Sequence, residues 1–305
     1  MSLKYAAGLI LGGLVSAVSA QASTYRETFM PENDLYKQDC IACESQSGFT
    51  QQQYLDVIAK ANRIFTPIIA AQGGTLNIVD HWSDATVNAS ATQHGDDWIV
   101  NMYGGLARRP EITVDGFTFV LCHELGHHLG GFPFVKGFLP PEAKWAASEG
   151  QADYFASHVC PALWWNDEAT AEIASTLPEI VKSQCNDVWK SPDQQNLCYR
   201  ASLAAKSTTD LLAALGGSRT SFNQHDTSVV SSTYTGHPAA QCRLDTYLAG
   251  ATCSQAWDTN VIPGKEGGRP DNSRAGEEAA AHHSCTALDS YTVGLRPACW
   301  FHATL

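Results

Sequence analysis

The sequence predicts an α+β fold, in which a small, mostly antiparallel sheet packs on a pair of helices and a mainly helical C-terminal part follows. Three observations support this prediction. A long helical pattern precedes short β-like runs, two later helical patterns carry histidines and carboxylates, and ten cysteines favour disulfide stapling. With 44% hydrophobic residues among 305, the chain can bury a sizeable core as one globular unit.

The first twenty residues have the pattern of a secretory signal. Lys4 supplies a positive charge, an apolar run covers residues 5–18, and small residues precede Gln21. The apolar run is short for a transmembrane helix, although an uncleaved N-terminal anchor is an alternative. We therefore expect an exported protein, periplasmic or secreted, whose mature chain has no transmembrane span.

Residues 51–71 predict a helix, because apolar side chains from Tyr54 to Phe65 recur at helical spacing and two glycines follow at 73 and 74. Three β-like runs come next, at residues 76–79, 85–91 and 98–102.

An antiparallel sheet made of these runs would lie ahead of the next helix. We expect residues 98–103 to form its edge, where an extended substrate can add by main-chain hydrogen bonds. Trp98, Asn101 and Tyr103 would then contact substrate. A buried structural strand is the alternative.

The stretch 123–127 reads His-Glu-Leu-Gly-His and lies in a predicted helix from Gly116 to Leu129, with Asp115 as its N-cap. Residues four apart share one face of a helix, so His123 and His127 can hold one zinc ion together. Glu124 is then placed to take a proton from a water that the metal activates. The alternative is an ordinary amphipathic helix with structural histidines.

Glu149 is the candidate third ligand. We expect a second helix to begin near Pro140-Pro141 and to end after Cys160, before Pro161. On that helix Asp153 shares a face with Glu149, and it can accept the free ring N–H of a ligating histidine, most simply His123. A solvated acidic face is the alternative.

The His-Glu-x-x-His helix followed by Glu149-x-x-x-Asp153 resembles the gluzincin peptidases, and is most similar to the HtpX and CaaX-prenyl-protease group. Residues 237–243, with His237-Pro238 and Arg243, match the downstream His-Pro-x-x-x-x-Arg element of that group. Residues 98–106 resemble its strand and Gly-Leu turn.

This resemblance covers roughly residues 75–250 and implies a zincin-like metallopeptidase domain over residues 21–253. It also implies that His237 lies close to the metal, where it stabilises the oxyanion or coordinates zinc in a resting state. Arg243 would hold this segment or bind a carboxylate. A loop histidine is the alternative for His237.

The chain differs from those relatives in lacking an internal membrane span and in its last residues. We expect residues 254–305 to form an extension strapped to the same domain by disulfides. By spacing we expect these pairs: Cys185–Cys198, Cys242–Cys253, Cys285–Cys299 and, bracing the metal helices, Cys122–Cys160. For Cys40 and Cys43 a structural role is favoured over redox chemistry or a second zinc site.

Other segments are less specific. The apolar loop 130–141 would line a specificity pocket, form a lid or enter the core. Further helices are expected near residues 168–183, 199–215 and 238–249, and residues 263–276 should form an exposed loop. A net charge of −12 argues against a nucleic-acid partner.

The predicted function is an exported zinc metalloendopeptidase acting on protein or peptide substrates. One Zn²⁺ would be held by His123, His127 and Glu149, with Glu124 as general base. His237 is the preferred oxyanion donor, ahead of Tyr154 and Tyr103. Two alternatives remain: a non-catalytic zinc-stabilised binding or chaperone-like module, and a zinc amidohydrolase acting on a non-peptide amide.

Overall fold

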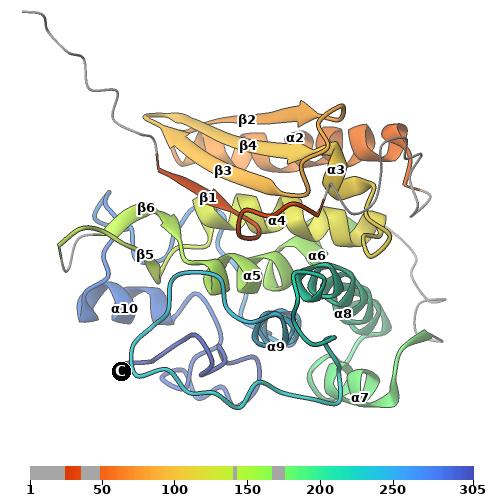
Figure 1. Cartoon of the computed structure of the whole chain (residues 1–305). Coiled ribbons are helices and arrows are strands. Elements are labelled where there is room, and N and C mark those ends of the chain that lie inside the picture. The colour runs from red at the N-terminus through yellow and green to blue at the C-terminus, as the bar shows by residue number, and fades with distance from the viewer. Residues whose placement is uncertain (1–24, 36–48, 140–142, 167–175) are drawn as a thin grey trace, which may run out of the picture.

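The computed structural model describes residues 25–35, 49–139, 143–166 and 176–305. The protein has an α+β fold in which helix α4 (Val114–Leu129) lies between a small sheet and helix α5 (Glu149–His158), as Figure 1 shows. Within the described ranges, no helix has the length and apolar character needed to cross a membrane. The expected signal sequence and Cys40 and Cys43 lie outside these ranges.

The sheet has four strands: β1 (Arg26–Thr28), β2 (Thr75–His81), β3 (Ala89–His94) and β4 (Asp97–Tyr103), in the order β1-β3-β4-β2. The pairs β1–β3 and β3–β4 are antiparallel, whereas β2–β4 is parallel. The sheet is therefore mixed. The expected antiparallel pairing is confirmed for two of its three strand pairs. After β2 the chain skips one position in the sheet to form β3, and β4 then lies between these two strands.

Because β4 has a neighbour on each side, the expectation that residues 98–103 form the edge is wrong. Trp98, Val100 and Met102 alternate along β4 and form its buried face. Such alternation in a sequence indicates which face of a strand is buried, but not which strands lie beside it. The edges are β1 and β2.

Helix α2 (Gln51–Ala71) has the expected bounds. Thr50 caps it in a capping box with Gln53, and Gly73 takes a φ of +80° where the chain turns into β2. Tyr54, one of its buried residues, donates a hydrogen bond to the carbonyl of Met102 at 2.6 Å and ties the helix to the sheet.

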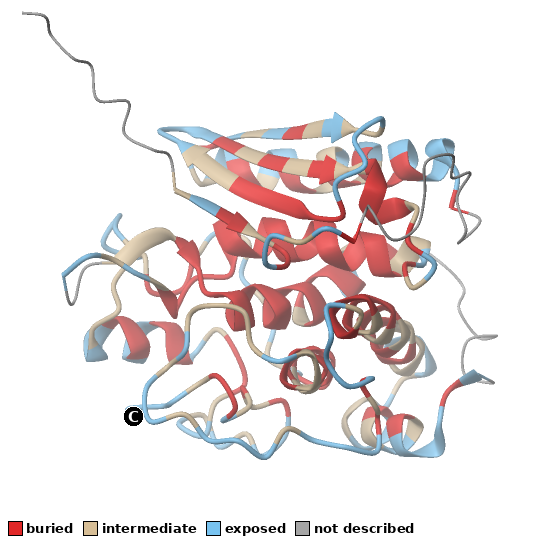
Figure 2. Ribbon diagram, viewed as in Figure 1, coloured by how far each residue is buried: buried red, intermediate tan, exposed pale blue. Residues whose placement is uncertain are grey.

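Helix α4 begins two residues before the expected start. Its N-cap is Thr113, which accepts from the Gly116 amide at 3.0 Å, while Asp115 lies in the first turn and pairs with Arg200 at 2.7 Å. Asp115 is therefore wrong as the cap. Nearly every residue of α4 from Gly116 onward is buried (Figure 2), because the sheet covers one side and α5 the other.

Helix α5 begins at Glu149, after Ser148, and not near Pro140 as expected. The residues just before it form β6 (Ala143–Ala147), which pairs with β5 (Phe134–Lys136). The apolar loop 130–141 divides: Phe132 and Phe134 enter the core, whereas Phe138 is 93% exposed. Pro161 does not end a helix but lies in the first turn of α6 (Cys160–Trp165).

The remaining helices are α3 (Gly104–Ala107), α7 (Glu179–Val188), α8 (Pro192–Ala213), α9 (Ala240–Ala251) and α10 (Arg274–Ala281). The predicted helices near 199–215 and 238–249 correspond to α8 and α9, and the predicted exposed loop 263–276 runs into α10. Helix α9 packs on α5, where Gly250 leaves no room for a side chain beside the Tyr154 carbonyl.

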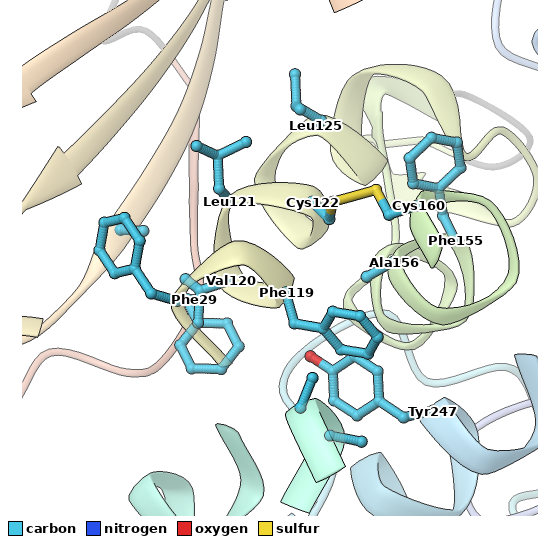
Figure 3. Packing of buried hydrophobic residues seen from close by; sticks show 14 of the residues in the cluster. Phe29, Phe119, Val120, Leu121, Cys122, Leu125, Phe155, Ala156, Cys160 and Tyr247 are labelled. Carbon is cyan, nitrogen blue, oxygen red and sulfur yellow. A yellow bond between two sulfur atoms is a disulfide. The ribbon is translucent and has the colours of Figure 1, made fainter. Parts of the chain in front are cut away.

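Four disulfides staple the described chain: Cys122–Cys160, Cys185–Cys198, Cys242–Cys299 and Cys253–Cys285. The first two confirm the expected pairs, and Figure 3 shows the Cys122–Cys160 disulfide, which links α4 to the first residue of α6. The expected pairs Cys242–Cys253 and Cys285–Cys299 are wrong. Cys242 and Cys253 lie at opposite ends of α9, about 16 Å apart at the helical rise, beyond the span of a disulfide.

Candidate metal centre

His123 and His127 of α4 converge with Glu149 at the start of α5. The two Nε2 atoms are 3.1 Å apart, and Glu149 Oε2 and Oε1 lie 3.3 Å from His123 Nε2 and 3.6 Å from His127 Nε2. All three side chains are fully buried, and their ligand atoms lie within 4.8 Å of one another. The structure thus brings together the three residues expected to hold a metal.

The other ring nitrogen of each histidine is held by an acceptor. His123 Nδ1 donates to Asp153 Oδ1 at 2.8 Å, and His127 Nδ1 donates to the Ala147 carbonyl at 2.8 Å. Burial lowers the pKa of both rings, so both are neutral. Their Nε2 lone pairs therefore point at one another and at Glu149.

This arrangement fits a cation. By distance and angle neither carboxylate oxygen of Glu149 has a hydrogen-bond donor in the part of the chain that the structure describes; besides the two imidazoles, the Glu27 carboxyl, His237 Nε2 at 3.4 Å and Arg243 Nη2 at 3.8 Å lie beside it. Three acceptor groups converge without a donor among them, and two imidazoles with a carboxylate are a donor set that zinc accepts. His123, His127 and Glu149 could therefore bind a metal ion.

Asp153 and Arg243 support this set from behind. Arg243 Nε and Nη2 donate to the two Asp153 oxygens at 2.6 and 2.7 Å, and both side chains are buried. Burial alone would raise the pKa of Asp153, but Arg243 and His123 outweigh it and lower this pKa. Asp153 therefore stays ionised and keeps the His123 proton on Nδ1. Arg243 also donates from Nη1 to the Phe29 carbonyl at 2.6 Å.

Glu124 lies next to His123 on α4 and is fully buried. By distance and angle neither of its carboxylate oxygens has a hydrogen-bond partner within the described residues, although the Phe29 backbone amide lies close enough to lower its pKa slightly. Burial raises the pKa of Glu124 well above its usual value, and the nearby Glu27 carboxylate raises it further. A cation in the adjacent site would favour the ionised form, since opposite charge lowers a carboxyl pKa.

His237 lies just before α9, beside the cluster. Its Nε2 donates to the Thr28 carbonyl at 2.7 Å and lies 3.4 Å from Glu149 Oε1. Burial, with the Arg243 charge, lowers its pKa to about 4, so the ring is neutral. His237 therefore lies beside the three candidate metal ligands, as the sequence predicted. Its ring already donates a hydrogen bond to a backbone carbonyl.

The residues expected to contact substrate lie elsewhere. Trp98 is buried and stacks on His128 with ring centroids 5.2 Å apart. Asn101 bonds to His81 at 3.0 Å, and Tyr103 stacks on the same ring at 4.8 Å. The side chains of all three residues therefore contact other parts of the protein from an internal strand. Tyr154, an alternative oxyanion donor, instead donates to the Gly294 carbonyl at 2.6 Å.

Sequence reasoning missed strand β1. Glu27, only 6% exposed, lies with its carboxyl group against that of Glu149, and burial raises the Glu27 pKa to about 7. The Phe29 ring meets the His123 ring edge-on at 5.3 Å. A strand of three residues has too few positions for a detectable period, so the sequence carried no signal for it.

The fold and site together define an α+β protein with a buried pair of imidazoles and a carboxylate suited to a metal ion. Comparison with family models, with curated protein sequences and with solved structures finds no match for this chain.

Proposed function

We propose that this protein is an exported zinc-dependent endopeptidase of the gluzincin type. One observation carries the proposal: two imidazole lone pairs and the Glu149 carboxylate converge beside Glu124, a buried carboxylate that makes no hydrogen bond with the described residues. A purely structural metal site needs no additional unpaired carboxylate next to its ligands. Four disulfides support an oxidising compartment.

His123, His127 and Glu149 would hold the zinc ion, and Asp153 with Arg243 fixes the tautomer and orientation of His123. When bound, zinc polarises a carbonyl and lowers the pKa of a water. Glu124 accepts the proton of the attacking water at its carboxylate and passes it to the leaving amine. The products are a carboxylate and an amine, so one water is consumed for each bond broken.

His237 is suited to the carbonyl oxygen of the substrate. Its neutral ring donates from Nε2 to a backbone carbonyl in this structure, next to Glu149. The same donor can meet the negative charge that develops on a carbonyl oxygen during attack.

Replacing Glu124 tests the proposal. The Glu124→Gln variant should keep one zinc per chain by elemental analysis and should lose about 10²–10⁴-fold in the rate of peptide hydrolysis. Glu179→Gln, at an exposed carboxylate that pairs with Lys182, is the matched control and should hydrolyse like the parent. Equal and measurable rates of hydrolysis for Glu124→Gln and the parent would refute the mechanism.

Complete burial of the cluster also favours a second candidate, a non-catalytic module stabilised by zinc. If this candidate is correct, the protein will bind zinc, but no form of it will hydrolyse peptides. The third candidate, hydrolysis of a non-peptide amide, expects such amides to be cleaved in preference to peptides.

A further inference from the structure

The candidate metal centre is covered by the protein itself. His123, Glu124, His127 and Glu149 are all fully buried. Residues 25–30, which we call the covering segment, lie over them with β1 at their centre. An endopeptidase must admit an extended chain to this place, so the identity of the cover matters.

The covering segment contacts the cluster through main chain and side chains. The Thr28 carbonyl accepts from His237 at 2.7 Å, and the Phe29 carbonyl accepts from Arg243 at 2.6 Å. The Phe29 ring lies against His123, with the Arg243 guanidinium 4.6 Å from its centroid. Glu27 faces Glu149.

The covering segment is also an extended strand on a sheet edge. It pairs antiparallel with β3, with Glu27 opposite Ala91 and Thr28 opposite Ser90. The Phe29 amide continues the ladder by donating to the Ala89 carbonyl at 3.2 Å. This is how an extended peptide ligand adds to a sheet.

A further strand cannot be added outside β1. Neighbouring strands lie about 4.8 Å apart, yet His237 Nε2 stands 2.7 Å from the Thr28 carbonyl. At the other end of β1, Lys144 Nζ lies 3.6 Å from the Tyr25 ring centroid, and Trp145 packs edge-on against the same ring. His237 therefore blocks the free main-chain edge at Thr28, and side chains of β6 pack around Tyr25 at its other end. A peptide that reaches the metal ligands must take the place of β1 on β3.

We propose that the covering segment occupies the place of the substrate strand and holds the endopeptidase latent until it leaves β3. This inference rests on the proposed function. The Thr28–Phe29 peptide group takes the place of the bond to be cleaved, with its carbonyl on the oxyanion donor His237. Extended peptides with a large aromatic residue following the cleaved bond should therefore be favoured substrates.

Contacts at both ends hold the covering segment. The Asn88 side chain accepts from the Met30 amide at 3.2 Å and donates to the Met30 carbonyl at 2.9 Å. Tyr25 is held by Lys144 and Trp145 of β6. The Tyr25 end is less buried than the Met30 end, so it can be loosened without removing a core side chain.

The main experiment releases the covering segment from the full-length chain. A specific protease site is inserted after Gln38, and the chain is cut and freed of its N-terminal fragment by gel filtration. We expect peptide hydrolysis and the rate of zinc removal by a chelator each to rise at least about tenfold. A synthetic peptide of residues 25–35 should reverse both changes, whereas a scrambled peptide should not. Unchanged rates in a cut, folded chain would overturn the inference.

Two uncut variants keep the test decisive if the cut chain unfolds. Tyr25→Ala and Lys144→Ala remove the contact at the exposed end from its two sides. Both should speed zinc removal by about threefold or more, relative to Tyr291→Ala, a partly exposed tyrosine in the C-terminal part bonded to Gln255. If both variants lose zinc at the rate of Tyr291→Ala, the covering segment does not guard the site.

The readouts separate the two proposals. If chelator access and peptide binding change as expected but no form hydrolyses peptides, the endopeptidase proposal fails and the covering role stands. If all forms hydrolyse at one rate that Glu124→Gln abolishes, the endopeptidase proposal stands and the covering role fails.

Discussion

The candidate metal centre gathers four acidic side chains. Glu27, Glu124, Glu149 and Asp153 are all buried, and the buried Arg243 hydrogen-bonds Asp153 and lies 3.8 Å from Glu149. Carboxylates this close cannot all ionise at neutral pH without a compensating charge, because burial penalises each one. A bound dication would supply that charge, so the acidic composition of the site favours one.

The Asp153→Asn substitution tests how Asp153 supports the cluster. Asparagine keeps the shape but loses the charge that holds the His123 proton on Nδ1 and pairs with Arg243. We expect zinc affinity to fall about 10–100-fold, measured by competition with a chromogenic chelator. Asp245→Asn on α9, which contacts His225 away from the cluster, should leave affinity unchanged.

His158 should make the protein sensitive to acid. Its Nε2 donates to the Gln255 carbonyl at 2.6 Å, and burial lowers its pKa from 6.5 to about 4. Between these values the unfolded state binds more protons than the folded state, so stability falls as pH falls from 6.5 to 4.

We expect His158 to account for about 2 kcal/mol of that loss, less than the full shift implies because the residue is only partly buried. Urea unfolding at several pH values measures the loss. The His158→Gln variant should show a flatter profile across the window, and His282→Gln, at an exposed histidine, should not. An identical profile for His158→Gln and the parent would contradict this account.

At the scale of elements, close helix contacts set the position of Glu149. A Cβ on Gly126 of α4 would lie 2.9 Å from the Ala152 carbonyl oxygen of α5, closer than such atoms approach. The crossing of α4 and α5 therefore depends on glycine, and this crossing places Glu149 opposite His123 and His127.

The Gly126→Ala variant should push α4 and α5 apart. We expect it to lose about 1–3 kcal/mol of unfolding free energy and to bind zinc more weakly. Urea unfolding and zinc titration measure the two effects. Gly217→Ala, where a Cβ meets only ordinary contacts, is the control. Full stability with full zinc affinity in Gly126→Ala would show that the crossing tolerates a side chain.

Sequence reasoning worked best where the residues that contact one another lie close together along the chain. The spacing of His123 and His127 on one helix, and of Glu149 and Asp153 on another, depends only on helical geometry. Cys185–Cys198 was predictable for a similar reason, since it joins two consecutive helices. The pairs of Cys242 and Cys253 were not, because they depend on where the segment after α9 returns.

Long-range pairing explains most of what the sequence did not predict. The neighbours of β4, and the position of β1 over the cluster, are set by contacts between residues far apart in the chain, such as Thr28 and His237. Local periodicity identifies the buried face of a strand but not its partners. The metal ligands could therefore be named from the sequence, whereas their cover could not.

At the scale of the whole molecule, metal binding should stabilise the fold. The metal ligands join α4 to α5. An ion at a free concentration 100-fold above its dissociation constant adds about 2.7 kcal/mol to the free energy of unfolding. Removing metal with a chelator should lower the thermal unfolding midpoint by about 4–5 °C, measured by calorimetry. The His127→Ala variant should start from the lower midpoint and show no further change, and a parent whose midpoint is insensitive to chelator would argue against a bound ion.

The last disulfide-linked segment has a consequence for when the cluster can assemble. The Trp300 ring packs directly on Gly150, next to Glu149, and Cys299 beside it is bonded to Cys242. During translation, residue 300 leaves the ribosome long after both histidines and Glu149 have been made. A nascent chain therefore cannot seat α5 in its final packing before this late segment arrives. Binding of a metal ion by His123, His127 and Glu149 would accordingly be a late step in the maturation of the protein.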